Sequence, residues 1–334
     1  MRKKIFAALG LIILILALYL IFNNKLTSVT RSGLAMNTLI RITLESFNKS
    51  EADLNKILDE AFDYIKLFES QVSLYDANSQ LNKINNMAGV EPVKVSSDVI
   101  ELVAKSIEIS NLTGKIFNPL IGPLTKLWKI NQVDKNDFKL PEPESIDQAL
   151  EFLDINIISL DLANQEIYLN KAGAVLDFGG IAKGYASRKL ADKFSSLGIE
   201  RALIDLGGNI QVVGSDWNIG IRDPLDKDKI ALKIKVNNQA VITSGAYERF
   251  KIINGIKYSH FFDPRTGMPV KNKMLSASLI IEDGALADAL ATSFMIMGDD
   301  EAQKFLASHQ DLNAILIIEE DNRIKIIEAG KIFR

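Results

Sequence analysis

The segment that most constrains the fold is 176–184, which reads Leu-Asp-Phe-Gly-Gly-Ile-Ala-Lys-Gly. Val175 and Leu176 favour the end of a strand, and the paired glycines permit backbone conformations that other residues avoid. Apolar residues then follow with helical spacing as far as Leu197, and Gly198 is typical of the position where a helix ends. The sequence therefore predicts a strand, a glycine turn and a helix.

The first turn of that helix contains a lysine where an anion would be expected. A helix that begins directly after glycines has free N–H groups at its amino end, and these suit a phosphate group. Lys183 adds a positive charge there, although the helix dipole favours a negative one. A bound anion would explain the lysine, and the alternative is an ordinary connection with a lysine on the surface.

Composition excludes several classes of function. The chain has 334 residues, a formal net charge of −3 and no cysteine. No broad basic field is present to recruit nucleic acid. Disulfides, thiolate zinc sites and a cysteine nucleophile are excluded, and the two histidines, His260 and His309, are too few for a multi-histidine metal site. A metal ion would therefore have oxygen ligands, which favours magnesium or calcium.

The amino terminus differs from the rest of the chain. Basic residues at positions 2–4 precede an unbroken apolar run from Ile5 to Phe22. This run has about the shortest length that spans a membrane, and no small-residue cleavage signature follows it. We expect residues 1–22 to be an uncleaved signal anchor in the inner membrane, with a cleaved signal peptide as the alternative. The basic end should stay cytoplasmic, so the rest would lie in the periplasm or otherwise outside the cytoplasm.

The body of the chain mixes strands and helices without strict alternation. Residues 23–33 resemble a polar linker, and 34–334 a single domain that consists of one unit or of two intertwined subdomains. Segment 38–44 alternates like a strand, and 54–68 has the apolar face of a helix. Asn254-Gly255 is the strongest hairpin signal. We expect an α+β fold with mixed, largely antiparallel sheets and packed helices, preceded by one N-terminal membrane-anchor helix.

Several shorter segments carry local predictions. Segment 115–124 is apolar but contains two prolines and a glycine, so it should be an irregular stretch that is buried or lines a pocket. Segment 131–143 is polar and predicts a surface loop. Ser145 and Gln148 form a capping box that would begin a short helix. Tyr75 is either an ordinary packing residue or a stacking platform for a planar ligand.

Segment 259–267 brings together an imidazole, a carboxylate and a guanidinium. His260 can transfer protons near neutral pH, and Arg265 can hold a phosphate through two parallel hydrogen bonds. The alternatives are a hydrogen-bonded structural histidine and an ordinary turn. Small polar residues at 243–245 suggest a close approach to a ligand, although a plain turn explains them equally well.

A late apolar helix carries two polar residues on one face. Asp288 and Thr292 are four positions apart, which places them on adjacent turns. An inward-facing carboxylate is costly unless it is paired or binds a metal ion. The two side chains would form part of a magnesium site that a backbone carbonyl, ligand phosphates and water complete. The alternative is that Asp288 lies at the solvent edge of the helix.

Five blocks between about Met36 and Gly298 resemble, in wording and order, the FAD:protein FMN transferases, which are the ApbE-type flavin transferases. The blocks are Leu-Asp-Phe-Gly-Gly-Ile-Ala-Lys-Gly-Tyr-Ala, Leu-Gly-Gly-Asn-Ile, Ser-Gly-Ala-Tyr-Glu-Arg, Ser-His-Phe-Phe-Asp-Pro-Arg-Thr-Gly and Ala-Asp-Ala-Leu-Ala-Thr. The resemblance implies a magnesium-dependent, extracytoplasmic enzyme that transfers the FMN moiety of FAD to a threonine of a target protein and releases AMP. The implied acceptor is a subunit of a membrane redox complex.

The resemblance also implies roles for individual residues. Mg²⁺ would be bound by the side chains of Asp288 and Thr292 and by the carbonyl of Gly180, and His260 with Asp288 would be the catalytic pair. The residues implied to contact FAD are Met36, Tyr75, Ile116, Phe117, Asn118, Asp177, Lys183 and Phe262. Cleavage of a diphosphate needs neutralised charge, which magnesium, Lys183 and Arg265 would supply. Either His260 or a carboxylate near the metal would take the proton of the acceptor threonine.

Some positions depart from the family pattern. Asn118 stands where many relatives have aspartate, and Asn37 where a glycine is usual. Ala246 replaces a frequent acidic residue, and Arg188 stands where aspartate often follows Gly-Tyr-Ala. We interpret these differences as tuning of the FAD pocket. Two other functions remain open, namely an FAD pyrophosphatase that yields FMN and AMP, and a membrane-tethered protein that binds FAD without catalysis.

Overall fold

The computed structural model describes residues 25–130, 140–226, 228–247, 249–253, 255–321 and 323–334. The signal anchor expected over 1–22 lies outside these residues, as does most of the polar loop expected over 131–143. Within the described ranges, no helix combines the length and the apolar character that crossing a membrane requires.

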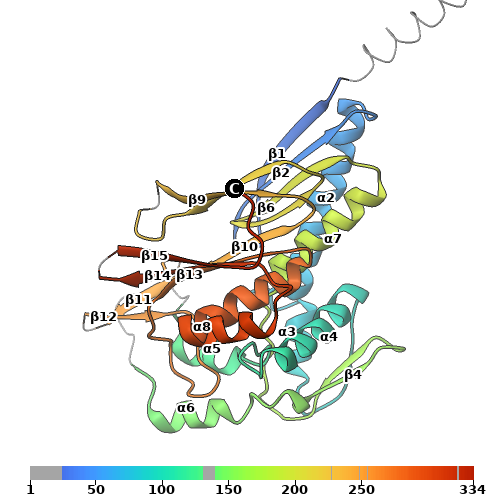
Figure 1. Cartoon of the computed structure of the whole chain (residues 1–334). Helices are drawn as coiled ribbons and strands as arrows, with labels where there is room; N and C mark the ends of the chain where they lie inside the picture. The colour runs from blue at the N-terminus through green and yellow to red at the C-terminus, as the bar shows by residue number, and fades with distance from the viewer. Residues whose placement is uncertain (1–24, 131–139, 227, 248, 254, 322) are drawn as a thin grey trace, which may run out of the picture.

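The fold is built on an eight-stranded sheet in which every neighbouring pair is antiparallel (Figure 1). Its strands, in spatial order, are β1 (Thr27–Ala35), β2 (Thr38–Ser46), β6 (Arg201–Leu206), β7 (Asn209–Val213), β10 (Ala240–Gly245), β13 (Met274–Ile281), β14 (Ala314–Glu320) and β15 (Arg323–Ala329). This arrangement confirms the predicted α+β class with antiparallel sheets.

Helices cover one face of this sheet, and a strand pair covers the other. The long helices lie against the lower face in the view of Figure 1, and the shorter helices lie below them. The helices are α2 (Glu51–Val72), α3 (Gln80–Asn86), α4 (Ser97–Leu112), α5 (Gly122–Trp128), α6 (Pro143–Leu150), α7 (Ala182–Ser196) and α8 (Gly284–Ser308), with a 3₁₀ turn, η1 (Ile155–Ile157). The opposite face packs on β8 (Trp217–Arg222) and β9 (Ile230–Val236) through a separate apolar cluster that includes Ile219, Ile234 and Ile317.

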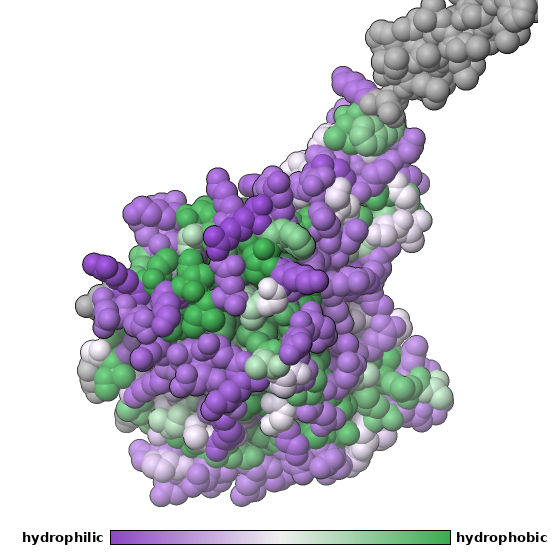
Figure 2. Space-filling model, in the orientation of Figure 1, coloured by the Kyte–Doolittle hydropathy of each residue, from purple (hydrophilic) through white to green (hydrophobic). Residues whose placement is uncertain are grey.

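Two further small sheets lie beside the helices. One contains β3 (Val93–Lys94), β5 (Glu166–Leu169) and β4 (Ile158–Asp161), and β4 and β5 form an antiparallel hairpin. The other is the hairpin of β11 (Phe250–Ile253) and β12 (Ile256–Ser259), as the Asn-Gly signal predicted. Hydrophilic side chains cover most of the face seen in Figure 2, and apolar ones gather in smaller patches between them. Most residues of the long apolar segments are therefore buried in the interior.

The polar linker predicted over 23–33 is wrong from Thr27 onward, because these residues form β1. Side chains along β1 alternate between exposed and half-buried, with threonine, serine and arginine among them. This edge strand is held by its pairing with β2 rather than by apolar burial. The two strands meet at Met36 and Asn37, whose φ angles are 50° and 60°. A tight two-residue turn of this kind accepts asparagine readily, which explains why Asn37 can replace the usual glycine.

The strand predicted at Val175 and Leu176 is also wrong, although the helix after the glycines is confirmed as α7. The backbone of Leu176 bonds a side chain instead of a neighbouring strand. Its N–H donates to Oδ1 of Asn85 at 2.8 Å, and its carbonyl accepts from Nδ2 of the same residue at 3.1 Å. The N–H of Asp177 donates to the carbonyl of Pro119 at 2.8 Å. These bonds fasten the glycine turn to the segment around 118–120.

Helix starts were harder to predict than helix existence. The capping box at Ser145 is wrong, since α6 begins at Pro143 after Glu142 and has no side-chain cap. The sequence did not predict α5, because the two prolines and the glycine of segment 115–124 disfavour a regular element. Proline is nevertheless well tolerated in the first turn of a helix, which is its position in α5. Within α8, whose apolar character the sequence predicted, the backbone is non-helical only at Gly298.

Helices α7 and α8 approach each other through two glycines. A Cβ atom on Gly184 would come within 2.1 Å of the carbonyl oxygen of Gly284, and one on Gly284 within 2.6 Å of the carbonyl oxygen of Gly184. Any larger residue at either position would force the helices apart, because real side chains do not tolerate such distances. This contact brings the start of α7 against the first turns of α8.

Candidate active site

A cavity of about 280 Å³ opens where α7, α8, β10, segment 116–121 and the start of β11 meet. With the exception of Arg265, every residue for which the sequence predicted a catalytic, FAD or metal role lines this cavity. These residues are Met36, Tyr75, Ile116, Phe117, Asn118, Asp177, Gly180, Lys183, His260, Phe262, Asp288 and Thr292. The structure thus collects segments that are far apart in the sequence, and their individual roles remain predictions.

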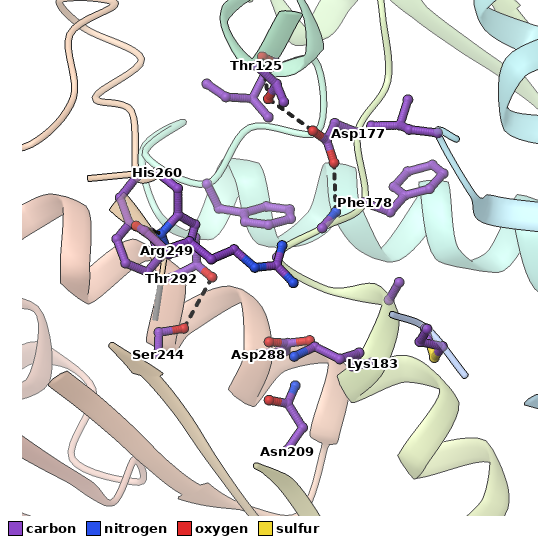
Figure 3. A pocket seen from close by; sticks show the side chains of 18 of the residues that line it. Thr125, Asp177, Phe178, Lys183, Asn209, Ser244, Arg249, His260, Asp288 and Thr292 are labelled. Atoms are coloured by element: carbon purple, nitrogen blue, oxygen red, sulfur yellow. Dashed lines mark hydrogen bonds between the residues drawn. The ribbon is translucent and has the colours of Figure 1, made fainter. Parts of the chain in front are cut away.

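Asp288 lies at the amino end of α7, although it belongs to α8. Its Oδ2 accepts a hydrogen bond from the backbone N–H of Gly184 at 2.9 Å, and the residue is only 4% exposed. Burial raises the pKa of Asp288, and the positive charge of Lys183 and the N–H of Gly184 oppose that rise. Figure 3 shows Lys183 beside the carboxylate. The Asp288 carboxylate therefore provides an anion at the first turn of α7, where Lys183 led us to expect one.

Thr292 faces the glycine turn from the next turn of α8. A Cβ atom on Gly180 would lie 3.0 Å from Oγ1 of Thr292, so the glycine backbone and the hydroxyl are in close contact. Oγ of Ser244 lies 3.5 Å from the same hydroxyl (Figure 3). Asp288 and Thr292 therefore bring a carboxylate and a hydroxyl to one region of the cavity, and the backbone of Gly180, whose carbonyl is the third predicted ligand, borders that region.

This donor set fits magnesium and does not fit a softer metal. All three groups are oxygen donors, as Mg²⁺ requires. Among the described residues, no group of three or more histidine, cysteine, aspartate or glutamate side chains could hold a metal ion by itself. Mg²⁺ is commonly bound by one or two carboxylates together with substrate phosphates. A site with one carboxylate would therefore depend on its substrate to complete the coordination.

The structure adds Asn209, which the sequence reading left without a role. Asn209 begins β7, is 3% exposed and lies near Asp288 and Lys183 in Figure 3. Its buried Nδ2 forms no hydrogen bond of normal geometry, but the amide lies close enough to Asp288 to help lower the pKa of that carboxyl group. Asn209 therefore places a donor beside the carboxylate, where an anionic oxygen of a ligand could also accept from it. The block Leu-Gly-Gly-Asn-Ile was the signal that could have identified it.

His260 lies at the base of the β11–β12 hairpin. Its Nδ1 is 2.9 Å from the carbonyl oxygen of Arg249. A carbonyl only accepts hydrogen bonds, so Nδ1 carries the proton and Nε2 of the neutral ring is the accepting nitrogen. Burial lowers the pKa of His260 to about 4, and the charges of Arg249 and Lys183 act in the same direction. The imidazole is therefore neutral at physiological pH.

Asp177 is fixed on the opposite side of the cavity from Asp288 (Figure 3). Its Oδ2 accepts from Oγ1 of Thr125 at 3.0 Å, and its Oδ1 accepts from the N–H of Gly179 at 2.8 Å. Burial raises the pKa of Asp177, and these two hydrogen bonds and the charge of Arg249 oppose the rise. The Asp177 carboxylate therefore stabilises the glycine turn, and it also lines the cavity, where a ligand could contact it.

The remaining walls of the cavity are flat and apolar. Phe117 and Phe262 are each 5% exposed, and the ring of Phe262 is backed by Trp128 at a centroid distance of 6.3 Å. Tyr75 is 74% exposed at the rim, which favours a stacking position over the core packing that sequence position alone suggested. Segment 115–124 is partly buried and lines the cavity, as predicted.

Asn118 has a structural task in addition to lining the cavity. Its Nδ2 donates to the carbonyl of Leu153 at 2.7 Å, and its Oδ1 accepts from the N–H of Leu120 at 2.9 Å. Both ends of the amide are therefore used to hold segment 118–120. An aspartate at this position could keep the second bond but not the first, because an ionised carboxylate cannot donate.

The role predicted for Arg265 is wrong. Its guanidinium is bound to the carboxylates of Asp263 and Glu301, and it does not line the cavity. Arg249 lines the cavity instead and points into it in Figure 3. The sequence contained this arginine at the end of the block Ser-Gly-Ala-Tyr-Glu-Arg, but nothing there showed that the chain turns its side chain inward.

Comparisons with known proteins agree with this geometry. The model of the ApbE family matches residues 36–316. The chain is 32% identical over 315 residues to the FAD:protein FMN transferase of Treponema pallidum, which covers 89% of this chain and 86% of the relative. It is 32% identical over 277 residues to an FAD:protein FMN transferase of Klebsiella pneumoniae, covering 83% and 85% of the two chains.

Solved structures show the same fold. The flavin transferase ApbE of Vibrio cholerae superposes with a TM-score of 0.81 at 26% identity, over 91% of this chain and 98% of that one. The ApbE protein of Thermotoga maritima gives a TM-score of 0.81 at 27% identity, over 91% and 97%. The similarity extends over nearly the whole described body, so it includes all the segments that line the cavity.

Proposed function

Because this chain belongs to the ApbE family, we propose that it is an FAD:protein FMN transferase that uses Mg²⁺ to transfer the FMN moiety of FAD to a threonine of an acceptor protein, with release of AMP. The observation that carries the proposal is the meeting of Gly180, Asp288 and Thr292 at one end of a cavity whose other walls are aromatic. A diphosphate suits the first end, and an isoalloxazine ring suits the second.

Mg²⁺ would be held by the Asp288 carboxylate, the Thr292 hydroxyl and the carbonyl of Gly180. When bound, it supplies neutralising charge to the diphosphate oxygens. Lys183 adds positive charge from α7 and Arg249 from the residue before β11, and the amide of Asn209 adds a donor beside Asp288. These groups are in place before the substrate arrives, so little reorganisation is needed when charge develops on the leaving phosphate.

The reaction that we propose is a single displacement at the FMN phosphorus. The threonine oxygen forms the new P–O bond, the diphosphate P–O bond breaks, and AMP leaves with the bonding electrons. His260 takes the proton of the threonine at Nε2, since Nδ1 is occupied by the carbonyl of Arg249. Asp288 is a poorer base, because its Oδ2 already accepts from Gly184 and the carboxylate is needed for charge neutralisation.

The remaining parts of the proposal concern FAD and the cell. The walls that would contact the flavin ring are formed by Phe117, Phe262 and Tyr75. Beside them lie Met36 and Ile116. Asp177, Asn118 and Lys183 complete the FAD contacts. The apolar segment 1–22 anchors the protein in the inner membrane, with the catalytic body in the periplasm or otherwise outside the cytoplasm. An acceptor in a membrane redox complex would be within reach of an enzyme held there.

Mass spectrometry of the products tests the proposal. The protein is mixed with FAD, Mg²⁺ and a threonine-bearing acceptor from a flavinylated redox complex. A gain of one FMN on the acceptor, together with AMP, supports transfer. Free FMN and AMP with an unmodified acceptor would instead show an FAD pyrophosphatase, and intact FAD would show a binding protein. The same acceptor with its threonine replaced by valine is the matched control and should remain unmodified.

A further inference from the structure

The β11–β12 hairpin connects the cavity to an exposed surface. Its base carries Arg249 and His260, which both line the cavity and are joined by the bond from Nδ1 to the Arg249 carbonyl. From there the two strands run outward, and in the described part of the chain neither of them pairs with a third strand. A molecule bound along the hairpin would therefore lie next to His260, the proposed acceptor of the threonine proton.

The two faces of the hairpin differ in their surroundings. The inner face is anchored to the body through Tyr258, which is buried and stacks on Trp128 at 5.9 Å, and through Ile253, which packs against the main core. The outer face, which we define as Phe250, Ile252 and Lys257, points away from the core. Phe250 is 42% and Ile252 66% exposed, and Ile252 and Lys257 are directly opposite in the ladder. The body thus fixes the hairpin and leaves apolar side chains open to solvent.

The hairpin is also positively charged. Residues 249–260 contain Arg249, Lys251 and Lys257 and no aspartate or glutamate, in a chain whose formal net charge is −3. Of these cations, Lys257 lies on the outer face, Lys251 is opposite Tyr258 on the inner face, and Arg249 lines the cavity. Lys257 lies 4.4 Å from the ring centre of Phe250, and Lys271 lies 5.3 Å from that of Tyr258. A cationic, partly apolar surface next to the cavity favours an acidic partner that also carries apolar side chains.

We propose that the outer face of the β11–β12 hairpin docks the acceptor protein through an acidic segment that carries the target threonine and covers Phe250 and Ile252. This inference rests on the proposed transfer function, because that function requires a macromolecule to reach His260. An anionic membrane surface would have similar chemistry. A membrane is disfavoured as the partner because the proposed anchor, residues 1–22, precedes β1. In Figure 1, β1 begins at the end of the body that lies far from the hairpin.

Direct binding tests the docking surface independently of catalysis. The probes are two fluorescent synthetic peptides with a central threonine and a leucine on each side, one with aspartate flanks and one with lysine flanks. Fluorescence anisotropy with the full chain, FAD and Mg²⁺ should show tighter binding of the acidic peptide. In the variant Lys257→Glu this peptide should bind about tenfold more weakly. FAD binding, followed by flavin fluorescence, should be unchanged.

The matched control reverses one lysine on another exposed strand pair. Lys235→Glu makes the same change in charge on β9, away from the cavity, and should bind the acidic peptide like the wild type. Ile252→Asn should weaken binding without a change in charge. Equal binding of both peptides, or equal losses in Lys257→Glu and Lys235→Glu, would overturn the docking surface. Binding of the chain to anionic phospholipid vesicles that Lys257→Glu abolishes, without any peptide preference, would also overturn it in favour of a membrane.

The outcomes separate this inference from the proposed function. If the acidic peptide binds at the hairpin but FAD is only hydrolysed, the transfer proposal fails while the surface stands. If a natural acceptor gains FMN equally well from the wild type and from Lys257→Glu, the transfer proposal stands and the docking surface is wrong.

Discussion

Oδ2 of Asp288 accepts a hydrogen bond from the backbone N–H of Gly184, so a carboxylate of α8 caps the amino end of α7. This bond orients the carboxylate from a rigid element and leaves it facing the cavity. It also keeps a charged group in a place where only 4% of the residue is exposed. Such an arrangement is costly for stability and therefore indicates a functional use of the charge.

Replacing Asp288 should separate activity from stability. Asp288→Asn keeps the shape and an oxygen for the Gly184 N–H but removes the charge that neutralises Mg²⁺. We expect transfer to fall by about a hundredfold or more. The melting temperature should not fall, because a desolvated charge has been removed. Asp300→Asn, at an exposed position of the same helix, is the control. Full transfer by Asp288→Asn would show that the metal site has been wrongly assigned.

Magnesium and FAD should bind cooperatively. The proposed site offers one carboxylate, and Mg²⁺ needs phosphate oxygens to complete its coordination. Calorimetric titration should therefore show weak binding of Mg²⁺ alone and much tighter binding when FAD is present without an acceptor. By linkage, Mg²⁺ should tighten FAD binding by the same factor. Equal Mg²⁺ affinity with and without FAD would contradict a site that the diphosphate completes.

The low pKa of His260 has a measurable effect on stability. The unfolded chain takes up a proton near pH 6.5, whereas folded His260 does so only at about pH 4. The unfolded state therefore binds more protons between these values, and the free energy of unfolding should fall as the pH is lowered from 6.5 to about 4. Urea unfolding of the wild type and of His260→Gln should show a smaller loss for the variant. Identical slopes would argue that His260 is solvated normally.

Arg249 and Arg265 should respond oppositely to truncation. Arg249→Ala should raise the KM for FAD by about tenfold, because it removes a cation that lines the cavity. Arg265→Ala should leave this KM unchanged, since that guanidinium is bound to Asp263 and Glu301. Loss of these partly exposed ion pairs in Arg265→Ala should lower the free energy of unfolding by about 1 kcal/mol or less. Steady-state kinetics and urea unfolding of both variants provide the comparison, and a KM effect confined to Arg265→Ala would reverse the assignment.

Asn118 should resist replacement by the aspartate that many relatives carry. In Asn118→Asp the bond to the Leu153 carbonyl is lost and a carboxylate oxygen faces that carbonyl. We expect a loss of about 1–3 kcal/mol in the free energy of unfolding and weaker FAD binding. Asn78→Asp, at an exposed position, controls for the added charge. An Asn118→Asp variant as stable as the wild type would show that segment 118–120 can rearrange.

Much of the architecture follows from local pattern. The helices α2, α7 and α8 were visible because their apolar residues recur at helical spacing, and the β11–β12 hairpin because Asn-Gly selects a tight turn. β1 was missed because an edge strand that is held by pairing alone has no apolar alternation. Val175 and Leu176 look like a strand, but their surroundings are a side chain and a loop, which no local pattern records.

The site was predictable to the extent that its residues lie in recognisable blocks. Lys183, His260, Asp288 and Thr292 stand in such blocks, and the structure brings them to one cavity. The choice between Arg249 and Arg265 was not predictable. Both follow small or turn-forming residues, and only the path of the hairpin and the position of Glu301 decide which guanidinium faces inward.

The close contact between Gly184 of α7 and Gly284 of α8 limits how far the adjacent end of the cavity can change shape. With Gly184 and Gly284 touching through their backbones, no side chain is available there to absorb a shift of either helix. The end of the cavity that is proposed to bind the diphosphate is consequently stiff, whereas the end proposed for the flavin is bounded by turns and a hairpin. Analogues altered on the ring should be accommodated more readily than analogues altered between the two phosphorus atoms, and laboratory evolution toward new flavins should leave both glycines untouched.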